Sequence, residues 1–339
     1  MKAIHIIALG LLALGLALAV VQPSPGVLAD ADGKMYWAEA FADKIQRANL
    51  DGTNVEDLVT TGLDHPAGIA LDVVGGKMYW TDANAMKIQR ANLDGTDVEN
   101  LLTEVFGPFG IALDVAGGKM YWTRWVNGEI QRANLDGTDV ENLVTGLAEP
   151  KGIALDVAGG KMYWAEANAM KIRRANLDGS GVEDLVTGLM DPFDIALDVA
   201  GGKMYWTDLG ANRIQRANLD GSGMEDLVDA GLGNGFQGIA LAVGWNKMYW
   251  TNTRGFDPGK IQRANLDGTD VQDMVTTGLS APYGIALDPA PAPIGGIAEL
   301  PDAAATGDAL PRNAIIIAAV TGMIAFGAGA FYARRRWMG

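Results

Sequence analysis

Four acidic side chains recur at one position of an internal repeat, and carboxylates grouped in this way are candidate ligands for a divalent metal ion. They are Glu39, Asp82, Glu166 and Asp208. A metal held by such a group could activate water for hydrolysis. However, the chain has no cysteine and only two histidines, His5 and His65, so a thiolate nucleophile is excluded and no distinct acid–histidine pair is available for acid–base catalysis. We therefore expect no catalytic residue, no bound metal and no cofactor.

A second candidate metal site is the segment Asn-Leu-Asp-Gly-Thr-Asp, which occurs at Asn134–Asp139 and in similar form elsewhere. A calcium loop of the EF-hand type requires an acid at its first position. Arg132 occupies that position here and carries the wrong charge. Because Asp-Gly is a strong signal for a tight hairpin, we interpret the segment as a turn.

Aromatic and basic residues form a third group, which suits protein recognition rather than catalysis. One position, just before a short apolar strand in each repeat, holds Tyr283, Ala67, Phe109, Lys151, Phe193 and Gln237. Nearby loops add Arg124, Trp125, Phe236, Arg254 and Phe256. Aromatic and arginine side chains dominate the energetics of many protein interfaces, so these residues are candidate ligand-binding residues. The alternative is that the rings fill a central channel or pack against neighbouring loops.

The elements that position these residues come from a repeat of about 42 residues. The phrase Gly-Lys-Met-Tyr-Trp, or a close variant, recurs with tryptophans at Trp37, Trp80, Trp122, Trp164, Trp206 and Trp250. In one repeat, the residue pattern predicts strands over residues 68–72, 77–81, 87–93 and 98–102, joined by turns at Gly75-Gly76 and Asp94-Gly95. Four short antiparallel strands per repeat are typical of a propeller blade, so we predict an all-β, six-bladed β-propeller.

The order of the strands predicts how the ring closes. The chain enters on a second strand at Gly33 and leaves on a first strand at residues 284–288. The last strand would therefore complete the first blade and remove the open edges of the ring. We assign the propeller to residues 30–288, with bulky Met, Tyr and Trp side chains of each blade packing on small residues of the next.

Two sets of loops vary most among the repeats: those between strands two and three, and those between strand four and the next blade. Both sets should emerge on one side of the disc, and loops on a rigid scaffold often carry binding sites. By contrast, an arginine recurs in the third strand of every repeat. Its presence in all the repeats argues for a structural role. These arginines are Arg47, Arg90, Arg132, Arg174, Arg216 and Arg263. We expect them to pair between blades with aspartates such as Asp72 and Asp114; the alternative is a basic binding ring.

Tyr79-Trp80-Thr81-Asp82 and the segment over 205–208 contain a complete YWTD motif, and four further copies are degenerate. Together with the Ala-Asn-Leu-Asp-Gly and Gly-Ile-Ala-Leu-Asp phrases over residues 33–288, this pattern resembles the class B repeats of the low-density lipoprotein receptor family. The resemblance implies a six-bladed propeller that binds proteins outside the cell without enzymatic activity, and a structural role for the acids of the motif. The chain lacks the cysteine-rich modules of the animal members, which favours a bacterial surface protein. Its ectodomain has only His65, so acid-triggered ligand release is not expected.

Both ends of the chain carry apolar segments. Residues 1–29 have the pattern of a secretory signal peptide, with an uncleaved membrane anchor as the alternative. The C-terminal part divides into a Pro/Ala/Gly-rich linker (289–312), a candidate transmembrane helix (313–333) and a short basic tail (334–339). The arginines of the tail place it in the cytoplasm and the propeller outside. Leu300-Pro301 opens a partial sortase-like motif, so processing of the tail and covalent attachment to a cell wall is the alternative.

The net charge of −15 argues against nucleic acid as a partner. The sequence therefore predicts a non-catalytic extracellular module for protein binding or adhesion, displayed on the cell surface by a C-terminal membrane helix. Its partner would be an extracellular protein or peptide, or a glycan. Two other functions stay open: a structural component of a surface layer, and a metal-dependent propeller hydrolase or oxidoreductase of the lactonase or sugar-dehydrogenase kind.

Overall fold

A computed structural model of the 339-residue chain describes residues 33–229, 235–253 and 259–289. By its internal contacts the chain divides into two units, residues 1–292 and 293–339, and all described residues belong to the first. The expected signal peptide, transmembrane helix and basic tail lie outside the described residues, as does the linker apart from Pro289. Within the described ranges, no helix is both long and apolar enough to cross a membrane.

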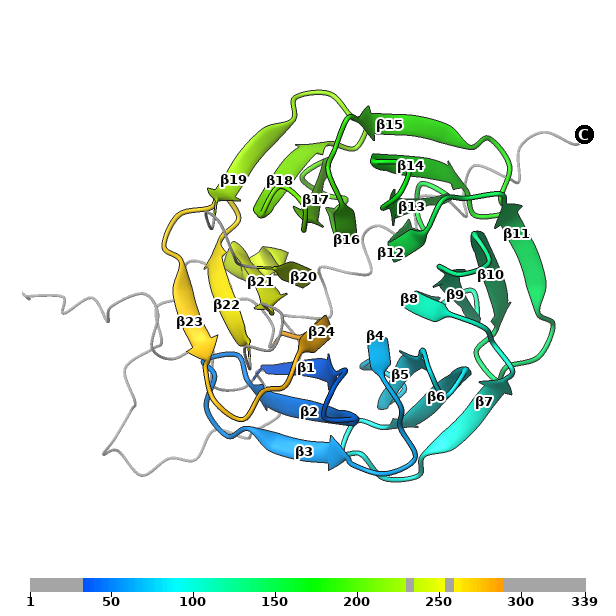
Figure 1. The fold of residues 1–339 in the computed structure, drawn as a ribbon, viewed down its shortest axis with the longest axis vertical. Helices are drawn as coiled ribbons and strands as arrows, with labels where there is room; N and C mark the ends of the chain where they lie inside the picture. Colours follow the sequence, from blue (N-terminus) through cyan, green and yellow to red (C-terminus); the bar gives the residue numbers. More distant parts are fainter. Residues whose placement is uncertain (1–32, 230–234, 254–258, 290–339) are drawn as a thin grey trace, which may run out of the picture. The chain divides into compact units, whose positions relative to one another are not determined.

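The described residues form six antiparallel sheets of four strands each, arranged as blades around a ring (Figure 1). Blade 1 contains β24 (Pro282–Asp288), β1 (Lys34–Glu39), β2 (Lys44–Asn49) and β3 (Glu56–Val59). Blade 2 contains β4 (Pro66–Asp72), β5 (Lys77–Asp82), β6 (Lys87–Asn92) and β7 (Glu99–Thr103). Blade 3 contains β8 (Pro108–Asp114), β9 (Lys119–Arg124), β10 (Glu129–Asn134) and β11 (Glu141–Thr145).

The other three blades repeat this order, with the innermost strand named first. Blade 4 contains β12 (Pro150–Asp156), β13 (Lys161–Glu166), β14 (Lys171–Asn176) and β15 (Glu183–Thr187). Blade 5 contains β16 (Pro192–Asp198), β17 (Lys203–Asp208), β18 (Arg213–Asn218) and β19 (Glu225–Asp229). Blade 6 contains β20 (Phe236–Ala242), the short 3₁₀ helix η1 (Val243–Trp245), β21 (Lys247–Asn252), β22 (Lys260–Asn265) and β23 (Gln272–Val275). The predicted six-bladed propeller is confirmed.

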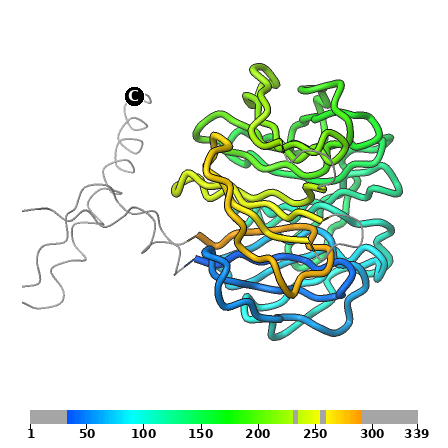
Figure 2. Tube along the Cα trace, turned by 60° about the vertical axis from the view of Figure 1, so that its left-hand side comes forward, coloured from blue at the N-terminus to red at the C-terminus, as the bar shows by residue number. Residues whose placement is uncertain are grey.

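The ring closes where the sequence predicts. β24 pairs with β1, with Lys34 opposite Asp288 and Trp37 opposite Ile285. Blade 1 is therefore built from both ends of the described chain (Figure 2). Because the last strand pairs with the first, every blade of the ring has its inner strand.

The hydrophobic core lies between neighbouring blades. Met78 and Trp80 of blade 2 pack with Tyr36, Ala38 and Ile45 of blade 1. The tryptophan and tyrosine of every copy of the motif are almost completely buried. Burial of one such aromatic side chain stabilises a fold by about 2–3 kcal/mol. The repeated motif therefore supplies the largest buried side chains of the core, as its pattern of bulky and small residues predicts.

The inner strands of neighbouring blades approach each other closely. A Cβ atom on Gly68 would lie 2.3 Å from the carbonyl oxygen of Phe109 in the next blade, which explains the glycine. Blade 5 has Asp194 at this position. Its carboxylate accepts hydrogen bonds from the amides of Ile195 and, in blade 6, Ile239, both at 2.9 Å. Asp194 thereby links two inner strands, and desolvation raises its pKa to about 6.

The third-strand arginines connect neighbouring blades, but not through the expected partners. Arg90 pairs with Glu99 of its own blade at 2.7 Å and donates to the carbonyl oxygen of Leu135 in the next blade at 3.2 Å. The predicted pairing with Asp72 or Asp114 is wrong, because each of those carboxylates accepts an amide hydrogen bond within its own turn. Equivalent links to the next blade are made by Arg47, Arg132, Arg174 and Arg216.

The Asn134–Asp139 segment is a hairpin turn, as predicted. The amide of Asn134 donates to the carbonyl oxygen of Thr138 at 2.9 Å, and the amide of Thr138 donates to Asp136 at 3.0 Å. Asp139 accepts a hydrogen bond from the side chain of Asn134 at 2.8 Å. The polar side chains of this segment therefore stabilise the turn itself.

Candidate protein-binding face

The loops that vary most in sequence lie together on one side of the ring, which we call the loop face. In each blade, the loop after the second strand hydrogen bonds to the segment before the first strand. For example, the amide of Trp125 donates to the carbonyl oxygen of Gly107 at 2.9 Å, and the amide of Leu209 donates to that of Asp191 at 2.9 Å. The two kinds of hairpin turn that repeat with little change among the blades lie on the opposite side, which we call the turn face. The predicted one-sided placement of the variable loops is confirmed.

The four acids considered as metal ligands fasten these loops. Asp208 accepts the amide of Asp191 at 2.9 Å, and Glu166 accepts the amide of Ala148 at 2.6 Å. The same kind of bond joins Glu39 to the amide of Ser280 and Asp82 to that of Asp64. Among the residues that the structure describes, no three His, Cys, Asp or Glu side chains gather as a group able to hold a metal ion. Each acid thus holds a loop of its own blade through a hydrogen bond.

Burial perturbs two of these acids. Desolvation raises the pKa of Glu39 to about 7 and that of Asp82 to about 6, although hydrogen bonds from amides lower both values. A carboxyl with a raised pKa can act as a general acid or base only where a substrate can reach it. Both side chains are completely buried beneath the loops, so the raised pKa values reflect their structural position.

Arg124 occupies the place of the loop-fastening acid in blade 3. Its guanidinium donates to the carbonyl oxygen of Phe106 at 3.2 Å and pairs with Glu129 at 2.7 Å. The loop is therefore held through a carbonyl group, whereas the acids of other blades hold an amide. The side chain of Arg124 is only 13% exposed, so it supports the loop face from below.

Three aromatic side chains predicted at the mouth of the channel meet in one cluster. The ring centres of Phe109 and Phe193 are 5.2 Å apart, and that of Tyr283 lies 6.2 Å and 5.9 Å from them. All three pairs have edge-to-face geometry, which aromatic rings favour. Ala67 completes the cluster. Phe109 and Phe193 are buried, while Tyr283 is partly exposed. Burial of the two phenylalanines agrees with the alternative that the rings fill the channel.

Lys151 joins this cluster as a cation among aromatic rings. Its ammonium group lies 4.4 Å from the ring centre of Trp125, 4.7 Å from that of Phe109 and 5.8 Å from that of Phe193. These distances are within the range of cation–π interactions. The same ammonium group pairs with Glu149 at 2.8 Å. Lys151 therefore connects the buried rings to Trp125, which is 37% exposed on the loop face.

The other predicted residues are placed less favourably for binding. Gln237 is buried and donates to Thr253 at 3.2 Å. Phe236 is only 1% exposed and packs edge-on against Trp250 in the core between blades 5 and 6, so it is not on the surface where it was expected. Phe236 stands at the position that proline occupies in the other five blades. Burial of its larger apolar ring stabilises the folded state. Arg254 and Phe256 lie outside the described residues.

His65 extends the aromatic cluster toward blade 1. Its ring centre lies 5.5 Å from that of Tyr283 and 5.7 Å from that of Phe41. Burial lowers the pKa of His65, although the carboxylates of Asp43 and Asp64 act in the opposite direction. The imidazole therefore favours its neutral form and contributes mainly as an aromatic ring.

Sequence reasoning missed a group of exposed apolar side chains on the loop face. They are Phe41, Met86, Phe106, Val126, Met170 and Met190. All belong to the variable loops, and Met190 is 64% exposed. The available signal is the presence of large apolar residues in loops that otherwise hold small or polar ones. Their apolar side chains are available for contact with a partner.

The fold and the loop face define the class of protein. The chain is a six-bladed β-propeller made of YWTD-type repeats. Residues 33–73, 76–115 and 118–157 match the family model for the low-density lipoprotein receptor repeat class B. The chain therefore carries three class B repeats, and the blades after residue 157 continue the same motif.

Individual proteins resemble this chain over a short segment of sequence or in fold. A segment of 40 residues is 50% identical to human low-density lipoprotein receptor-related protein 4, over 12% of this chain and 2% of that protein. A chain of the crystallised nidogen/laminin complex superposes with a TM-score of 0.68 and 23% identity, over 75% of this chain and 98% of that chain. Virginiamycin B lyase from Staphylococcus aureus shares the fold with a TM-score of 0.56 and 18% identity, over 74% of this chain and 84% of that chain. This chain thus matches only a small part of the receptor-related protein, and its similarity to the two structures is one of fold.

Proposed function

We propose that this protein is a non-catalytic extracellular module for protein binding or adhesion, and that its loop face contacts the partner. The observation that carries the proposal is the group of exposed apolar side chains on that face. The group includes Phe106 and Val126 near blade 3 and Met170 and Met190 in blades 4 and 5, and the partly exposed Trp125 lies beside Val126 in sequence. Aromatic and methionine side chains are enriched in the centres of protein interfaces.

The position of the two ends of the described chain supports the loop face as the surface that contacts the partner. Lys34 begins β1 directly opposite Asp288, the last residue of β24. In the other blades this is the place of a hairpin turn, so both ends of the ring lie on the turn face (Figure 2). An anchor beyond residue 289 would therefore be joined to the ring through its turn face rather than its loop face. We accordingly infer a signal peptide over 1–29, a linker over 289–312 and a membrane helix over 313–333.

The similar proteins support a binding role by analogy. One is a receptor-related protein, and another comes from a complex of nidogen with laminin. The fold is also shared with a lyase, so fold alone does not distinguish binding from catalysis. What favours binding in this chain is that its recurring acids are hydrogen bonded under separate loops rather than gathered around one reaction centre.

Site-specific photocrosslinking on intact cells tests the proposal. Benzoylphenylalanine in place of Val126 on the loop face should form a covalent adduct with the partner. The same residue in place of Val115, an exposed valine on the turn face of the same blade, should not. Adducts from neither position, or the same adduct from both, would contradict the loop face as the contact surface.

A further inference from the structure

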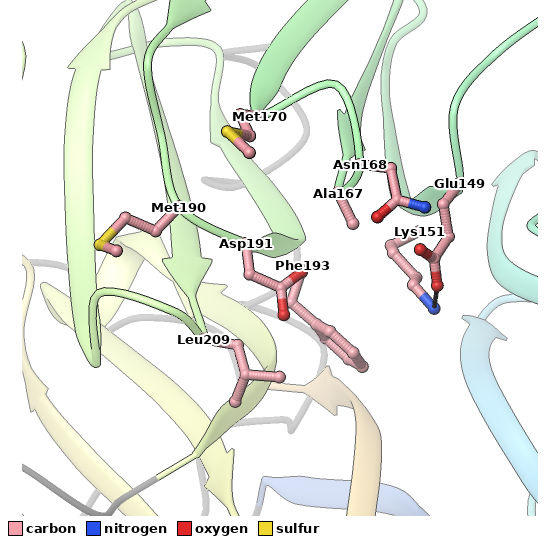
Figure 3. Close-up of a pocket in the computed structure, with 9 residues that line it drawn as sticks. All are labelled: Glu149, Lys151, Ala167, Asn168, Met170, Met190, Asp191, Phe193 and Leu209. Carbon is pink, nitrogen blue, oxygen red and sulfur yellow. Dashed lines mark ion pairs between the residues drawn. The ribbon is translucent and has the colours of Figure 1, made fainter.

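A cavity of about 360 Å³ opens on the loop face between blades 4 and 5 (Figure 3). Blade 4 contributes Glu149, Lys151, Ala167, Asn168 and Met170, and blade 5 contributes Met190, Asp191, Phe193 and Leu209. Cavities of this volume lie at the lower end of the range found for small-ligand sites. The cavity therefore has room for one long side chain of a partner.

Asp191 is the charged group of this cavity that has no direct partner. Among the described residues, its partly buried carboxylate accepts no hydrogen bond and forms no ion pair. Lys151, the cation of the cavity, is already paired with Glu149 at 2.8 Å and lies over the ring of Trp125. Burial raises the pKa of Asp191; the nearby Lys151 ammonium group lowers it, while the charges of Glu149 and Asp208 raise it. The ionised cavity has two carboxylates and one ammonium group, so it carries an excess of one negative charge.

Two methionines form apolar walls beside this carboxylate. Met170 is 50% exposed and Met190 is 64% exposed, and both line the cavity with Asp191 (Figure 3). Methionine side chains are flexible and adapt to the shape of an apolar partner. Lysine and arginine combine an apolar methylene chain with a terminal cation. Their chemistry matches apolar walls next to an unpaired carboxylate.

Blade 2 provides an internal comparison, because it contains the same Ala-Asn-Ala-Met loop. Residues 83–86 of blade 2 repeat residues 167–170 of blade 4. The blade that follows has Phe106 and Gly107 at the positions of Met190 and Asp191. The shared loop is therefore present at both junctions, while the carboxylate is present only at the junction of blades 4 and 5. Asp191 is the feature that gives this cavity its charge specificity.

We propose that the cavity between blades 4 and 5 receives a cationic side chain, lysine or arginine, of the partner protein, with Asp191 as its counter-ion. This inference rests on the proposed binding function of the loop face. The cation would form a charge-assisted hydrogen bond with Asp191 while its methylene chain contacts Met170 and Met190. The net charge of −15 on the chain also favours the approach of a cationic partner.

NMR of the full chain, labelled with ¹³C at the methionine methyl groups, tests the cavity directly. The probes are N-acetyl-arginine methylamide, N-acetyl-lysine methylamide and the neutral N-acetyl-citrulline methylamide. The methyl signals of Met170 and Met190, assigned by leucine substitution, should shift saturably with at least one cationic probe and not with the citrulline probe. Met86, in the matching loop of blade 2, should not respond.

Two variants complete the test. Asp191→Asn should weaken binding of the cationic probe about fivefold or more, because it removes the counter-ion with little change of shape. Glu104→Gln removes an exposed acid elsewhere on the loop face and should leave the affinity unchanged. Comparison of the two cationic probes shows which cation the cavity takes, and saturable binding of either supports the proposal.

The proposal is overturned if neither cationic probe binds, if the citrulline probe binds equally well, if Met86 responds as Met170 does, or if Asp191→Asn keeps the wild-type affinity. These failures are separate from failure of the proposed function. A chain that ignores the probes but still forms an adduct through position 126 retains the loop face as a binding surface and loses the cation site alone.

Discussion

The Asp194 carboxylate accepts a hydrogen bond from the amide of Ile239 at 2.9 Å, so that a side chain of blade 5 holds the main chain of blade 6. Its other oxygen accepts the amide of Ile195 at 2.9 Å. The other five blades have glycine at the position of Asp194. At the junction of blades 5 and 6, a carboxylate therefore adds a polar link between the inner strands.

Replacement of Asp194 by asparagine should destabilise the ring. Asparagine offers one acceptor oxygen, and its NH₂ group would face the second amide, so one of the two hydrogen bonds is lost. We expect a decrease of about 1–3 kcal/mol in the free energy of unfolding, measured by urea denaturation. Asp226→Asn, which removes a surface ion pair with Arg213, should cost less than about 1 kcal/mol. Equal effects of the two substitutions would mean that the link between blades contributes no more to the free energy of unfolding than a surface ion pair does.

The raised pKa of Glu39 predicts a dependence of stability on pH. Burial raises this pKa from an ordinary value of 4.5 to about 7 in the folded state. The folded state therefore binds the proton more tightly than the unfolded state. The resulting stabilisation is fully present below about pH 4.5 and is lost as the pH rises through 7.

Glu39→Gln should reduce this dependence between pH 4.5 and 7, measured by urea denaturation at a series of pH values. Glutamine does not titrate, and its side chain can still accept the amide of Ser280. The matched control is Glu104→Gln on the exposed loop face, which should keep the wild-type slope. If the Glu39 variant also keeps that slope, Glu39 does not titrate near neutrality in the folded protein.

Trp164→Ala should lower the free energy of unfolding by about 3–5 kcal/mol, because it leaves a large cavity in the core. Trp164 is fully buried and packs with Tyr121, Ile130 and Met162 at the junction of blades 3 and 4. Trp125→Ala is the control, since Trp125 is partly exposed on the loop face and should cost less than about 1.5 kcal/mol. Chemical denaturation of the two variants separates them. A similar loss in both would argue against a core located between the blades.

The sequence was sufficient to predict the ring, because the repeat period and the alternation within each strand are both local patterns. The strand predicted over 77–81 is observed over Lys77–Asp82, and the predicted pairing of the last strand with the first is observed. The partners of the arginines were not predictable from spacing. Arg90 lies opposite Glu99 only through the register of two strands, and its bond to Leu135 depends on the packing of two blades.

The residues of the candidate site could be predicted from the sequence, but the extent to which each side chain is buried could not. Residue type and position in the repeat identify Phe109, Phe193, Lys151 and Trp125, and the structure brings them together. Their depth depends on how rings from different blades pack on one another, which one repeat does not reveal. The burial of Phe236 is not evident from its place in the repeat, because it depends on contact with Trp250 in another strand. Met190 and Asp191 were missed because their importance comes from the loop of the adjacent blade.

A circular permutant tests whether the blades are structurally equivalent. Joining Asp288 to Lys34 through Val-Ala-Gly-Gly would copy the turn that follows Asp114, and opening the chain between Ala116 and Gly117 would make blade 3 the blade built from both ends. Because the same pairing closes either ring, the permutant should keep the fold and unfold within about 1 kcal/mol of the wild-type free energy.

Deletion of residues 283–288 is the contrasting change. It removes most of β24, leaves the edge of β1 unpaired and takes away the contacts that Ile285 makes in the core between blades 6 and 1. An unpaired edge and an exposed core favour aggregation, so the shortened chain should elute as aggregates in size-exclusion chromatography while the permutant elutes as the wild type does. If the permutant also aggregates, closure depends on the particular residues of blade 1, and the pairing of first and last strands is not by itself what holds the ring together.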